Sequence, residues 1–328
     1  AASIIGVSNA SKGAGATFLL LGRSKLAEET ASWIDWDDDQ LNARKMELRE
    51  SLIAESETGK VTMVEWNNAW TKLTRSMDIY RTISEIESCG NNAEYHSANV
   101  TDSDSISAAV NGRKVTGIVH GAGLEESKLV ADKEWRIFDL IVRVKVDGWK
   151  SLYSVAGDSL RFACAFTSVA GRFGNGGQTD YAAANSILDA EMARLTATGE
   201  CRAVAIGWTG WRDVGMATRG SIEAVFESAG IETLSVEDGV EIFVGEALAG
   251  GKRRVLGCGS LGLMDRYDSF REAPLKLPAE MAASIADPRR FPLIDKLISL
   301  EEGKSLVSQC TLSVQDHPFL VDHAIEGV

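Results

Sequence analysis

Short apolar runs alternate with longer amphipathic patterns along the first 260 residues of the chain. The runs are continuous, as is typical of strands buried on both faces, and the stretches between them repeat apolar residues at helical spacing. This alternation predicts an α/β fold with a doubly wound parallel sheet, whose ligands bind beyond the carboxyl ends of the strands. The expected strands are Ser3–Val7, Ala16–Leu21, Glu94–Ala98, Gly117–His120, Phe162–Phe166, Arg202–Ile206 and Arg254–Gly257. The expected helices include Ile79–Cys89, Ser103–Val110, Lys133–Ser154, Tyr181–Thr198 and Val236–Ala249.

The span from about 26 to 76 departs from this alternation because it is too long for a simple connection. It contains acidic runs and four tryptophans, and disordered segments are poor in aromatic residues. We therefore expect a helical insertion that packs against the body through Trp33, Trp36, Trp66 and Trp70.

The start of the chain is a second departure. A dinucleotide-binding fold needs a strand, a glycine-rich turn and a helix before its second strand, yet only eight residues separate Ser3–Val7 from Ala16. Gly6, Gly13 and Gly15 also lack the expected spacing. Two interpretations stay open: a degenerate cofactor fold, or a segment left out between about Val7 and Gly13, which we favour.

Proline usage marks a boundary, because all five prolines lie at or after Pro274. Proline is disfavoured inside regular helices and central strands, so the first part of the chain suits a regular fold. We expect a main domain over residues 1–265, a linker over 266–289 and a separate, β-rich fragment over 290–328.

Composition narrows the class of protein. A net charge of −13 and a pI of about 4.9 argue against a nucleic-acid partner. No apolar run reaches the length of a membrane span, and the first residues lack the layout of a signal peptide. Five scattered cysteines without a CxxC pair indicate reduced thiols, and the four histidines indicate no metal site. The expectation is a cytoplasmic protein without membrane or nucleic-acid partners.

The most informative stretch for chemistry runs from Thr167 to Asn185. Ser168 ends an apolar strand, and Tyr181 follows thirteen residues later in the first turn of a predicted helix, so the two hydroxyls can meet across one site. A phenol titrates near 10, so a neighbour must lower the pKa of Tyr181 before it acts as an acid near neutral pH. Lys145, which lies between valines in the preceding predicted helix, would by itself be expected to extend to solvent.

These residues resemble the active-site segment of ketoreductase domains of type I polyketide and polyunsaturated-fatty-acid synthases, in the short-chain dehydrogenase/reductase superfamily. Most members of that superfamily place a lysine four residues after the tyrosine, where this chain has Asn185. Synthase ketoreductases exchange the two residues, and this chain shows both halves, KVDG at 145–148 and YAAAN at 181–185. The resemblance covers roughly residues 16–265 and implies a Rossmann-like sheet.

The resemblance also implies roles. Ser168 would hydrogen-bond the substrate carbonyl, and Tyr181 would protonate the alkoxide formed by hydride transfer. Lys145 would lower the pKa of Tyr181 and bind the nicotinamide ribose, and Asn185 would orient Lys145 or a water molecule. Further cofactor contacts are expected at strand ends, where an arginine suits the 2′-phosphate of NADPH. These residues are Arg23, Ser24, Asn99, Val100, His120, Gly121, Ala122 and Gly123, with His120 in a packing rather than a catalytic role.

Three further features complete the resemblance. Thr209 stands where the family commonly has proline, and residues 212–230, with Met216, are expected to cover the substrate as a lid. Residues 290–328 resemble the entry to a dehydratase-type hot-dog domain, in which His323 and Gly327 match a catalytic HxxxG context.

The resemblance as a whole implies NADPH-dependent reduction of a 3-oxoacyl group on acyl carrier protein to a 3-hydroxyacyl group. The partners would be the phosphopantetheine-bound β-ketoacyl carrier protein and other domains of the same multifunctional synthase. Two alternatives remain. A free-standing short-chain alcohol dehydrogenase would normally have lysine in place of Asn185, and a non-enzymatic pseudo-ketoreductase would explain the irregular glycines.

Overall fold

The computed structural model divides the chain into two compact units, Ala1–Gly259 and Ser260–Val328. In the second unit, β7 (Lys296–Glu301) and β8 (Ser305–Gln309) form an antiparallel hairpin. The residues described by the structure are 2–212, 226, 230–248, 250, 254–262, 294–301 and 305–313.

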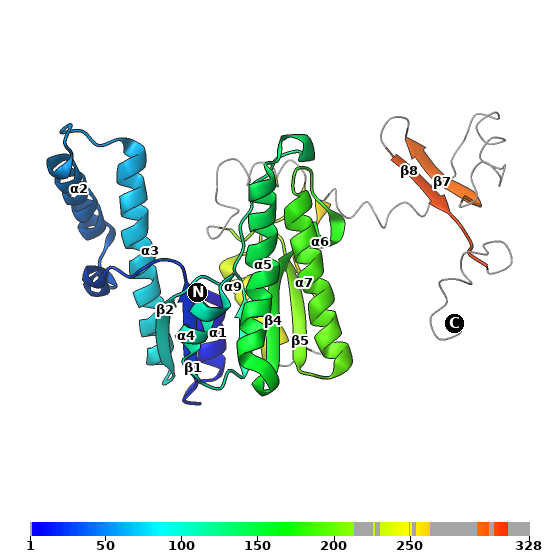
Figure 1. Ribbon diagram of the computed structural model, residues 1–328, viewed down its shortest axis with the longest axis horizontal. Helices are drawn as coiled ribbons and strands as arrows, with labels where there is room; N and C mark the ends of the chain where they lie inside the picture. Colours follow the sequence, from blue (N-terminus) through cyan, green and yellow to red (C-terminus); the bar gives the residue numbers. More distant parts are fainter. Residues whose placement is uncertain are drawn as a thin grey trace. The chain divides into compact units, whose positions relative to one another are not determined.

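Parallel strands and helices alternate through the first unit (Figure 1). The predicted parallel α/β architecture is therefore confirmed, although the described strands of this unit form two separate sheets, one with the order β1-β2 and one with the order β3-β4-β5-β6. The strands are β1 (Thr17–Gly22), β2 (Asn92–Ser97), β3 (Gly117–His120), β4 (Phe162–Ser168), β5 (Arg202–Trp208) and β6 (Arg254–Gly257). The helices are α1 (Ala2–Ala10), η1 (Glu28–Trp33), α2 (Asp38–Glu55), α3 (Met63–Ser88), α4 (Ser103–Val110), η2 (Val130–Asp132), α5 (Trp135–Ala156), η3 (Gly157–Ser159), α6 (Val169–Phe173), α7 (Thr179–Thr198) and α9 (Val236–Leu248).

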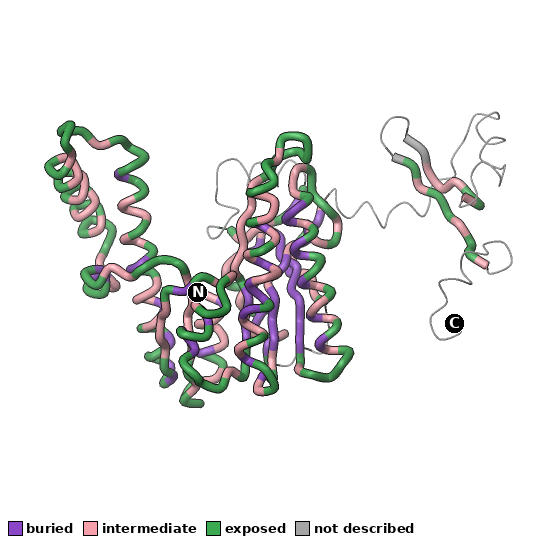
Figure 2. Tube along the Cα trace, viewed as in Figure 1, coloured by how far each residue is buried: buried purple, intermediate pink, exposed green. Residues whose placement is uncertain are grey.

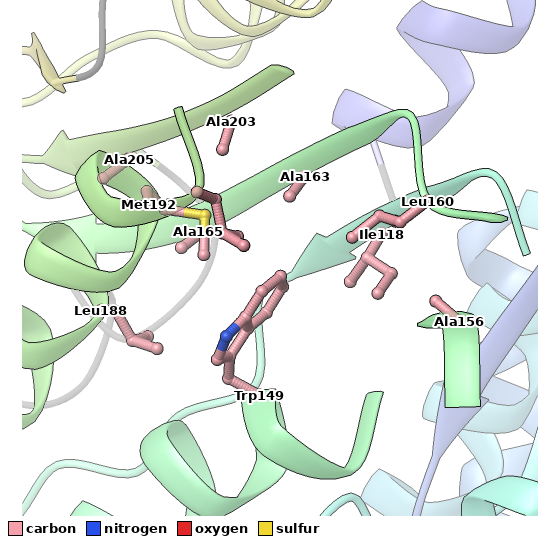
Figure 3. Packing of buried hydrophobic residues seen from close by; sticks show 11 residues of the cluster. Ile118, Trp149, Ala156, Leu160, Ala163, Ala165, Leu188, Met192, Ala203 and Ala205 are labelled. Carbon is pink, nitrogen blue, oxygen red and sulfur yellow. The ribbon is translucent and has the colours of Figure 1, made fainter. Parts of the chain in front are cut away.

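The core lies on the four-stranded sheet, where small side chains let two helices approach closely. Trp149 of α5 and Leu188 and Met192 of α7 are at most 3% exposed and pack on alanines of β4 and β5 (Figure 3). On the opposite face, the ring of Phe243 in α9 lies 5.2 Å from that of Phe166 in β4. Both faces of this sheet are covered, which explains the continuous apolar runs of its strands.

The two-stranded sheet is less enclosed. The apolar residues of β1 are only half-buried, whereas most of β4 and β5 is buried (Figure 2). Leu19 and Leu21 of β1 pack with Ile106 and Ala109 of α4. Helix α1 contacts α9 and α3, and its Gly6 permits this approach, because a Cβ there would lie 2.6 Å from Val240 Cγ1.

The predicted strand Ser3–Val7 is wrong, because these residues belong to helix α1. A short apolar run cannot be assigned to a helix or a strand by periodicity alone. The backbone also continues directly from the helix: Ser11 N donates to Val7 O at 2.9 Å, and Ala14 N donates to Ser11 O at 3.0 Å. Helix α1 is therefore the helix that precedes β1.

The span from 26 to 76 contains η1, α2 and the first half of α3. Capping boxes at Asp37 and Thr62 begin the two long helices. The tryptophans contact one another and basic residues of α2, whereas the sequence predicts contacts with the body. The rings of Trp33 and Trp36 stack at 5.0 Å, and Lys45 lies 5.2 Å from the ring centroid of Trp66. Among the described helices, none is both long and apolar enough to cross a membrane.

Candidate active site

Ser168 and Tyr181 lie where the end of β4 meets the first turn of α7. Ser168 is the last residue of β4 and the N-cap of α6, since its Oγ accepts a hydrogen bond from Ala170 N at 3.2 Å. Tyr181 is 9% exposed. Burial raises the pKa of the Tyr181 phenol, hydrogen bonds with Ser168 and Asn185 oppose this effect, and the charge of Glu125 adds to it. At neutral pH Tyr181 is therefore a protonated donor.

Lys145 enters the same region from α5. Its side chain is buried, and Nζ donates to the carbonyl oxygen of Phe166 at 2.9 Å. Burial lowers the pKa of Lys145 to about 8, against the opposing charge of Asp189. Nζ also lies 5.8 Å from the centroid of the Tyr181 ring.

The sequence predicts a lowered pKa for Tyr181, whereas the phenol in this structure has a raised pKa. Burial is the largest influence on the phenol and shifts its pKa upward. The Lys145 ammonium is bound to the Phe166 carbonyl oxygen and faces the tyrosine ring. Ser168 and Asn185 are the groups that favour the phenolate.

Asn185 lies one helical turn after Tyr181 and is fully buried. Its Nδ2 donates to the carbonyl oxygen of Tyr181 at 2.7 Å, while its Oδ1 has no hydrogen-bond partner among the described residues. Helix α6 comes very close at this point, because a Cβ on Gly171 would lie 2.8 Å from the Cβ of Asn185. The position of Asn185 is thus fixed by packing, with one acceptor oxygen left open.

Gly148, the last residue of the KVDG motif in α5, lies close to Val100 and His120. His120 is 1% exposed, and its Nε2 lies 2.9 Å from the carbonyl oxygen of Lys145, to which it donates. Burial, with the charge of Lys145, lowers the pKa of His120 to about 4, so the imidazole is neutral. A Cβ on Gly148 would lie 3.0 Å from Val100 Cγ1 and 3.2 Å from His120 Cε1. Gly148 therefore lets the end of β3 and the residue Val100 approach α5.

The glycines after β3 lie beside the same lysine. A Cβ on Gly123 would be 3.2 Å from Lys145 Cε, and one on Gly121 would be 3.8 Å from the Phe166 ring. Ala122 lies between them in the same turn. Because Gly121 and Gly123 have no side chains, the backbone of this turn can lie close to Lys145 and Phe166.

The residues expected at the adenosine end form a separate group at the carboxyl ends of β1 and β2, which pair in register from Thr17 to Gly22. Arg23 and Ser24 are exposed after β1, and Asn99 is exposed after β2. The carbonyl oxygens of Arg23 and Ser24 accept hydrogen bonds from side chains of β2. The Oδ1 of Asn99 accepts from Thr101 N at 3.3 Å.

The structure thus brings some of the predicted site residues together and keeps others apart. Ser168, Tyr181, Asn185 and Lys145 lie together, with the turn from His120 to Gly123 beside them. The hydrogen bonds of Arg23, Ser24 and Asn99 described above all stay within the ends of β1 and β2. The two groups of residues are therefore positioned by different sheets.

A buried ion pair beside Tyr181 was not predicted. Lys133 Nζ lies 2.5 Å from Asp180 Oδ1, and the two side chains are 2% and 0% exposed. Asp180 Oδ1 also accepts from Tyr181 N at 2.9 Å, and Lys133 donates to Glu126 O at 3.0 Å. The pair fastens the segment after β3 to the start of α7. The only signal in the sequence is that Asp180 precedes Tyr181, which ordinarily indicates an exposed acid at a helix N-terminus.

Thr209 occupies the position where the family commonly has proline. Its N–H donates to Gly257 O at 3.1 Å, a hydrogen bond that proline cannot make. The loop that follows β5 is thus held to the end of β6 by a backbone hydrogen bond. Met216 of the expected lid, and His323 and Gly327, lie outside the described residues.

The residues fit the nicotinamide half of a dinucleotide cofactor better than its pyrophosphate. The open Oδ1 of Asn185 and the buried ammonium of Lys145 are an acceptor and a donor suited to ribose hydroxyls. Gly13 and Gly15, in contrast, lie at the opposite edge of the sheet, because Gly13 N donates to Cys89 O and Ala16 N donates to Asn91 Oδ1, just before β2. They cannot form a phosphate-binding turn at the carboxyl ends of the strands.

Another set of glycines with the G-x-G-x-x-G spacing begins at Gly257, after β6. Side chains occupy the space above it, since a Cβ on Gly257 would lie 2.3 Å from Trp208 and one on Gly259 would lie 2.4 Å from Glu232 Oε2. These side chains prevent a pyrophosphate from reaching the backbone of Gly257 and Gly259. Neither glycine set therefore supplies the phosphate contacts.

Comparison with known proteins agrees with this geometry. Residues 52–213 match the family described as KR domain. The chain is 30% identical over 243 residues to a polyunsaturated fatty acid synthase polypeptide of Thraustochytrium sp., covering 69% of this chain and 8% of the relative. It is 33% identical over 172 residues to erythronolide synthase EryA2 of Saccharopolyspora erythraea, covering 52% of this chain and 5% of the relative. The chain thus spans less than a tenth of either relative.

Two solved structures show the same fold. A ketoreductase domain from the bacillaene assembly line aligns with a TM-score of 0.56 and 22% identity, covering 81% of this chain and 55% of that one. The ketoreductase from the first module of phoslactomycin biosynthesis in Streptomyces aligns with a TM-score of 0.52 and 25% identity, covering 61% of this chain and 47% of that one. The residues gathered around Tyr181 all lie within residues 52–213, the part matched by the KR domain family. Residues 52–213 of the chain belong to the KR domain family, and the relatives that they resemble are polyketide and polyunsaturated-fatty-acid synthases.

Proposed function

We propose that this chain reduces a 3-oxoacyl group on acyl carrier protein to a 3-hydroxyacyl group, with NADPH, as one cytoplasmic domain of a multifunctional synthase. The observation that supports the proposal most is the meeting of Ser168 and Tyr181 with Lys145 and Asn185, in the exchanged order of synthase ketoreductases. The substrate would be a β-ketoacyl chain on phosphopantetheine, delivered by the carrier protein, with other domains of the same synthase as partners.

The chemistry of these residues suits reduction of a ketone. When bound, the nicotinamide cofactor supplies the hydride. The Ser168 hydroxyl, held at the end of β4, donates a hydrogen bond to the substrate carbonyl oxygen and stabilises the charge that develops there. Tyr181, protonated at neutral pH, transfers its proton to that oxygen as general acid. The phenolate left behind is stabilised by the hydrogen bonds of Ser168 and Asn185.

Lys145 and Asn185 would bind the ribose beside Tyr181, the first as donor and the second through its open Oδ1. At the other end, the exposed guanidinium of Arg23 suits a 2′-phosphate, which favours NADPH over NADH. Replacement of Arg23 by alanine should raise KM for NADPH about 10-fold and leave KM for NADH unchanged, since one charge-assisted contact contributes roughly 1.5 kcal/mol.

The test follows NADPH consumption by the full chain with a β-ketoacyl thioester, together with NADPH binding by fluorescence titration. Tyr181→Phe should lower kcat by at least about 100-fold because the general acid is lost, while NADPH affinity stays nearly constant. Tyr153→Phe is the matched control, because Tyr153 is partnered with Glu200 at the far end of α5 and should leave turnover unchanged. Normal turnover by the Tyr181→Phe chain would refute the mechanism.

A pseudo-ketoreductase is the second candidate, and one observation favours it: Gly13 and Gly15 lie at the wrong edge of the sheet for a phosphate-binding turn. A chain of that kind would show no saturable NADPH binding in the same titration. A free-standing short-chain alcohol dehydrogenase is disfavoured by Asn185 and Lys145. For residues 290–328 the proposal remains the start of a dehydratase-like hot-dog domain, a suggestion with which the β7–β8 hairpin is compatible.

A further inference from the structure

The segment that follows β3, residues 121–134, is bound to the residues just before Tyr181. Lys128 N donates to Gly177 O at 3.0 Å. Gly177 has a φ of 77°, and a Cβ there would lie 3.3 Å from Lys128 N, so glycine suits this close approach. The segment after β3 and the start of α7 are therefore joined directly through their backbones.

A buried ion pair is a second connection between them. The side chains of Lys133 and Asp180 are 2% and 0% exposed, and Lys133 Nζ lies 2.5 Å from Asp180 Oδ1. Lys133 also donates to Glu126 O at 3.0 Å, so the ammonium is held within its own segment as well. The other carboxylate oxygen, Asp180 Oδ2, is buried and has no hydrogen-bond partner among the described residues.

Stability alone does not account for this pair. Two buried charges lose their hydration, and an apolar pair of similar volume is often equally stable or more stable. The unpartnered oxygen of Asp180 adds to the cost, because a buried acceptor without a donor is destabilising. Removal of only one partner is harmful for another reason, since it leaves the remaining charge buried alone. A role in fixing a particular geometry explains the complete pair better.

Asp180 binds the backbone of Tyr181 at a helix end that lacks an ordinary cap. Helix α7 begins at Thr179, and its N-cap residue, Gln178, makes no side-chain cap hydrogen bond. The first N–H groups of a helix have no partner within the helix. Asp180 Oδ1 accepts from one of them, Tyr181 N, at 2.9 Å. The carboxylate that Lys133 binds thus stabilises the turn that carries the phenol.

Both backbone groups of Tyr181 are consequently bound by side chains. Asp180 accepts from the N–H, and Asn185 Nδ2 donates to the carbonyl oxygen at 2.7 Å. Asn185 is fixed by close packing against α6, whereas Asp180 is fixed by Lys133 from another part of the chain. The place of the phenol beside Ser168 depends on both contacts.

We propose that Lys133 and Asp180 are positioning residues for the general acid. This inference rests on the proposed function, in which Tyr181 donates the proton. Lys133 anchors the Asp180 carboxylate to the segment after β3, and the carboxylate fixes the first turn of α7. Without the pair this turn loses its cap, and the phenol shifts away from Ser168 and from the substrate oxygen that Ser168 binds.

The test removes both charges together, so the net charge of the chain stays the same. Lys133→Met/Asp180→Leu replaces the pair by apolar residues and should keep the urea midpoint close to that of the wild-type chain. Lys133→Gln/Asp180→Asn is the conservative variant, because its two amides can repeat the hydrogen bonds to each other and to Tyr181 N. Arg143→Met/Asp139→Leu is the matched control, since that ion pair of α5 is exposed.

The first measurement is the titration of the Tyr181 phenol, which needs neither cofactor nor substrate. Tyrosinate absorbance after rapid pH jumps is recorded for each chain and for the same chain with Tyr181→Phe, and the difference isolates this phenol. Burial raises the pKa of Tyr181, so a phenol that leaves its place should titrate closer to 10. The pKa should fall by at least about 1 in the Lys133→Met/Asp180→Leu chain and stay constant in the conservative variant and the control.

The second measurement follows NADPH consumption with a β-ketoacyl thioester. In the Lys133→Met/Asp180→Leu chain kcat should fall at least about 10-fold, because misplacement of a reacting group by about 1 Å can cost about 100-fold. KM for NADPH should change less than about 3-fold, since the pair acts on the proton donor. The conservative variant and the control should keep kcat within about 3-fold of the wild-type value.

An unchanged phenol titration in a folded Lys133→Met/Asp180→Leu chain would overturn the inference, and so would an equal loss in the Lys133→Gln/Asp180→Asn chain. If the first chain does not fold, Lys133→Met/Asp180→Asn takes its place with the same expected result, because asparagine has nearly the shape of aspartate. A wild-type chain that reduces no ketone would count against the proposed function, whereas the phenol titration would still decide whether the pair positions Tyr181.

Discussion

The sequences of β1 (TFLLLG) and β5 (RAVAIGW) are similarly apolar, yet six of seven residues are buried in β5 and none in β1. The difference comes from their neighbours. β5 lies between β4 and β6 and under α7, and its small alanines admit Leu188 and Met192. Among the described strands β1 pairs only with β2, and its leucines are half-buried. An apolar run therefore predicts a strand, whereas its burial depends on elements elsewhere in the chain.

The candidate site divides along the same line. Lys145, Tyr181 and Asn185 are buried and held by specific contacts next to the four-stranded sheet. Arg23 and Asn99 are exposed at the ends of the two-stranded sheet. Under the proposed function, the residues for reduction would lie beside the four-stranded sheet, and those for cofactor specificity would lie at the ends of the two-stranded sheet. The following predictions test this contrast.

The largest effect is expected from the buried ion pair beside Tyr181. Lys133→Met or Asp180→Asn should each lower the free energy of unfolding by about 3–5 kcal/mol, because each leaves a buried group without its charged partner. Urea titration measures the loss. Asp147→Asn is the control, since the pair of Arg143 with Asp147 is exposed and should cost about 0–1 kcal/mol. A cost below about 1 kcal/mol at Lys133 and Asp180 would show that the pair is not structurally important.

Truncation of a leucine should distinguish the two sheets directly. Leu188→Ala opens a cavity in the enclosed core and should cost about 2–5 kcal/mol. Leu20→Ala removes a half-buried side chain of β1 and should cost only about 1 kcal/mol. Equal losses in urea titrations of the two variants would contradict the difference in packing between the sheets.

The pH dependence of stability should report the burial of Lys145. Its pKa falls from 10.5 to about 8 in the native state, so between these values the unfolded chain binds more protons than the native chain. Stability therefore rises with pH across that window, by on the order of 3 kcal/mol. The measurement is the difference between the wild-type and Lys145→Met chains, which removes the contributions of other titrating groups. A difference that stays constant from pH 8 to 10.5 would refute the buried, charged lysine.

The smallest effect concerns the loop after β5. Thr209→Pro should lower stability by about 1–3 kcal/mol, since it removes the N–H that binds Gly257 O and leaves that acceptor unpaired. Thr209→Val keeps the N–H and should cost less than about 1 kcal/mol. If proline stabilised the chain instead, the hydrogen bond would be unimportant and the residue common in the family would be the better one.

Much of the well-packed part could be predicted from the sequence. The bounds of β3, β6 and α4 match the expected ranges, because continuous apolar runs and an N-cap at Asp102 mark them. The grouping of Lys145 with Tyr181 and Asn185 follows from the resemblance of the KVDG and YAAAN motifs to those of synthase ketoreductases. Those motifs depend on local spacing, which a sequence displays.

The rest depends on contacts between distant residues. The sequence of helix α1 predicts a strand because a short apolar run fits both structures. The pairing of Lys133 with Asp180 joins residues 47 positions apart with no motif between them. The raised pKa of Tyr181 follows from the depth of its burial, which is a property of the folded chain.

Helix α3 has a mechanical consequence. It is a single helix of 26 residues without glycine or proline, about 39 Å long, so it has no hinge. Its carboxyl half packs on β2 and α1, with Ile86 fully buried, and its amino half carries the α2 hairpin (Figure 1). A force on the loop between α2 and α3 would therefore be transmitted through α3 to the two-stranded sheet, after whose strands Arg23 and Asn99 lie. The insertion and the two-stranded sheet should therefore move together as one rigid element.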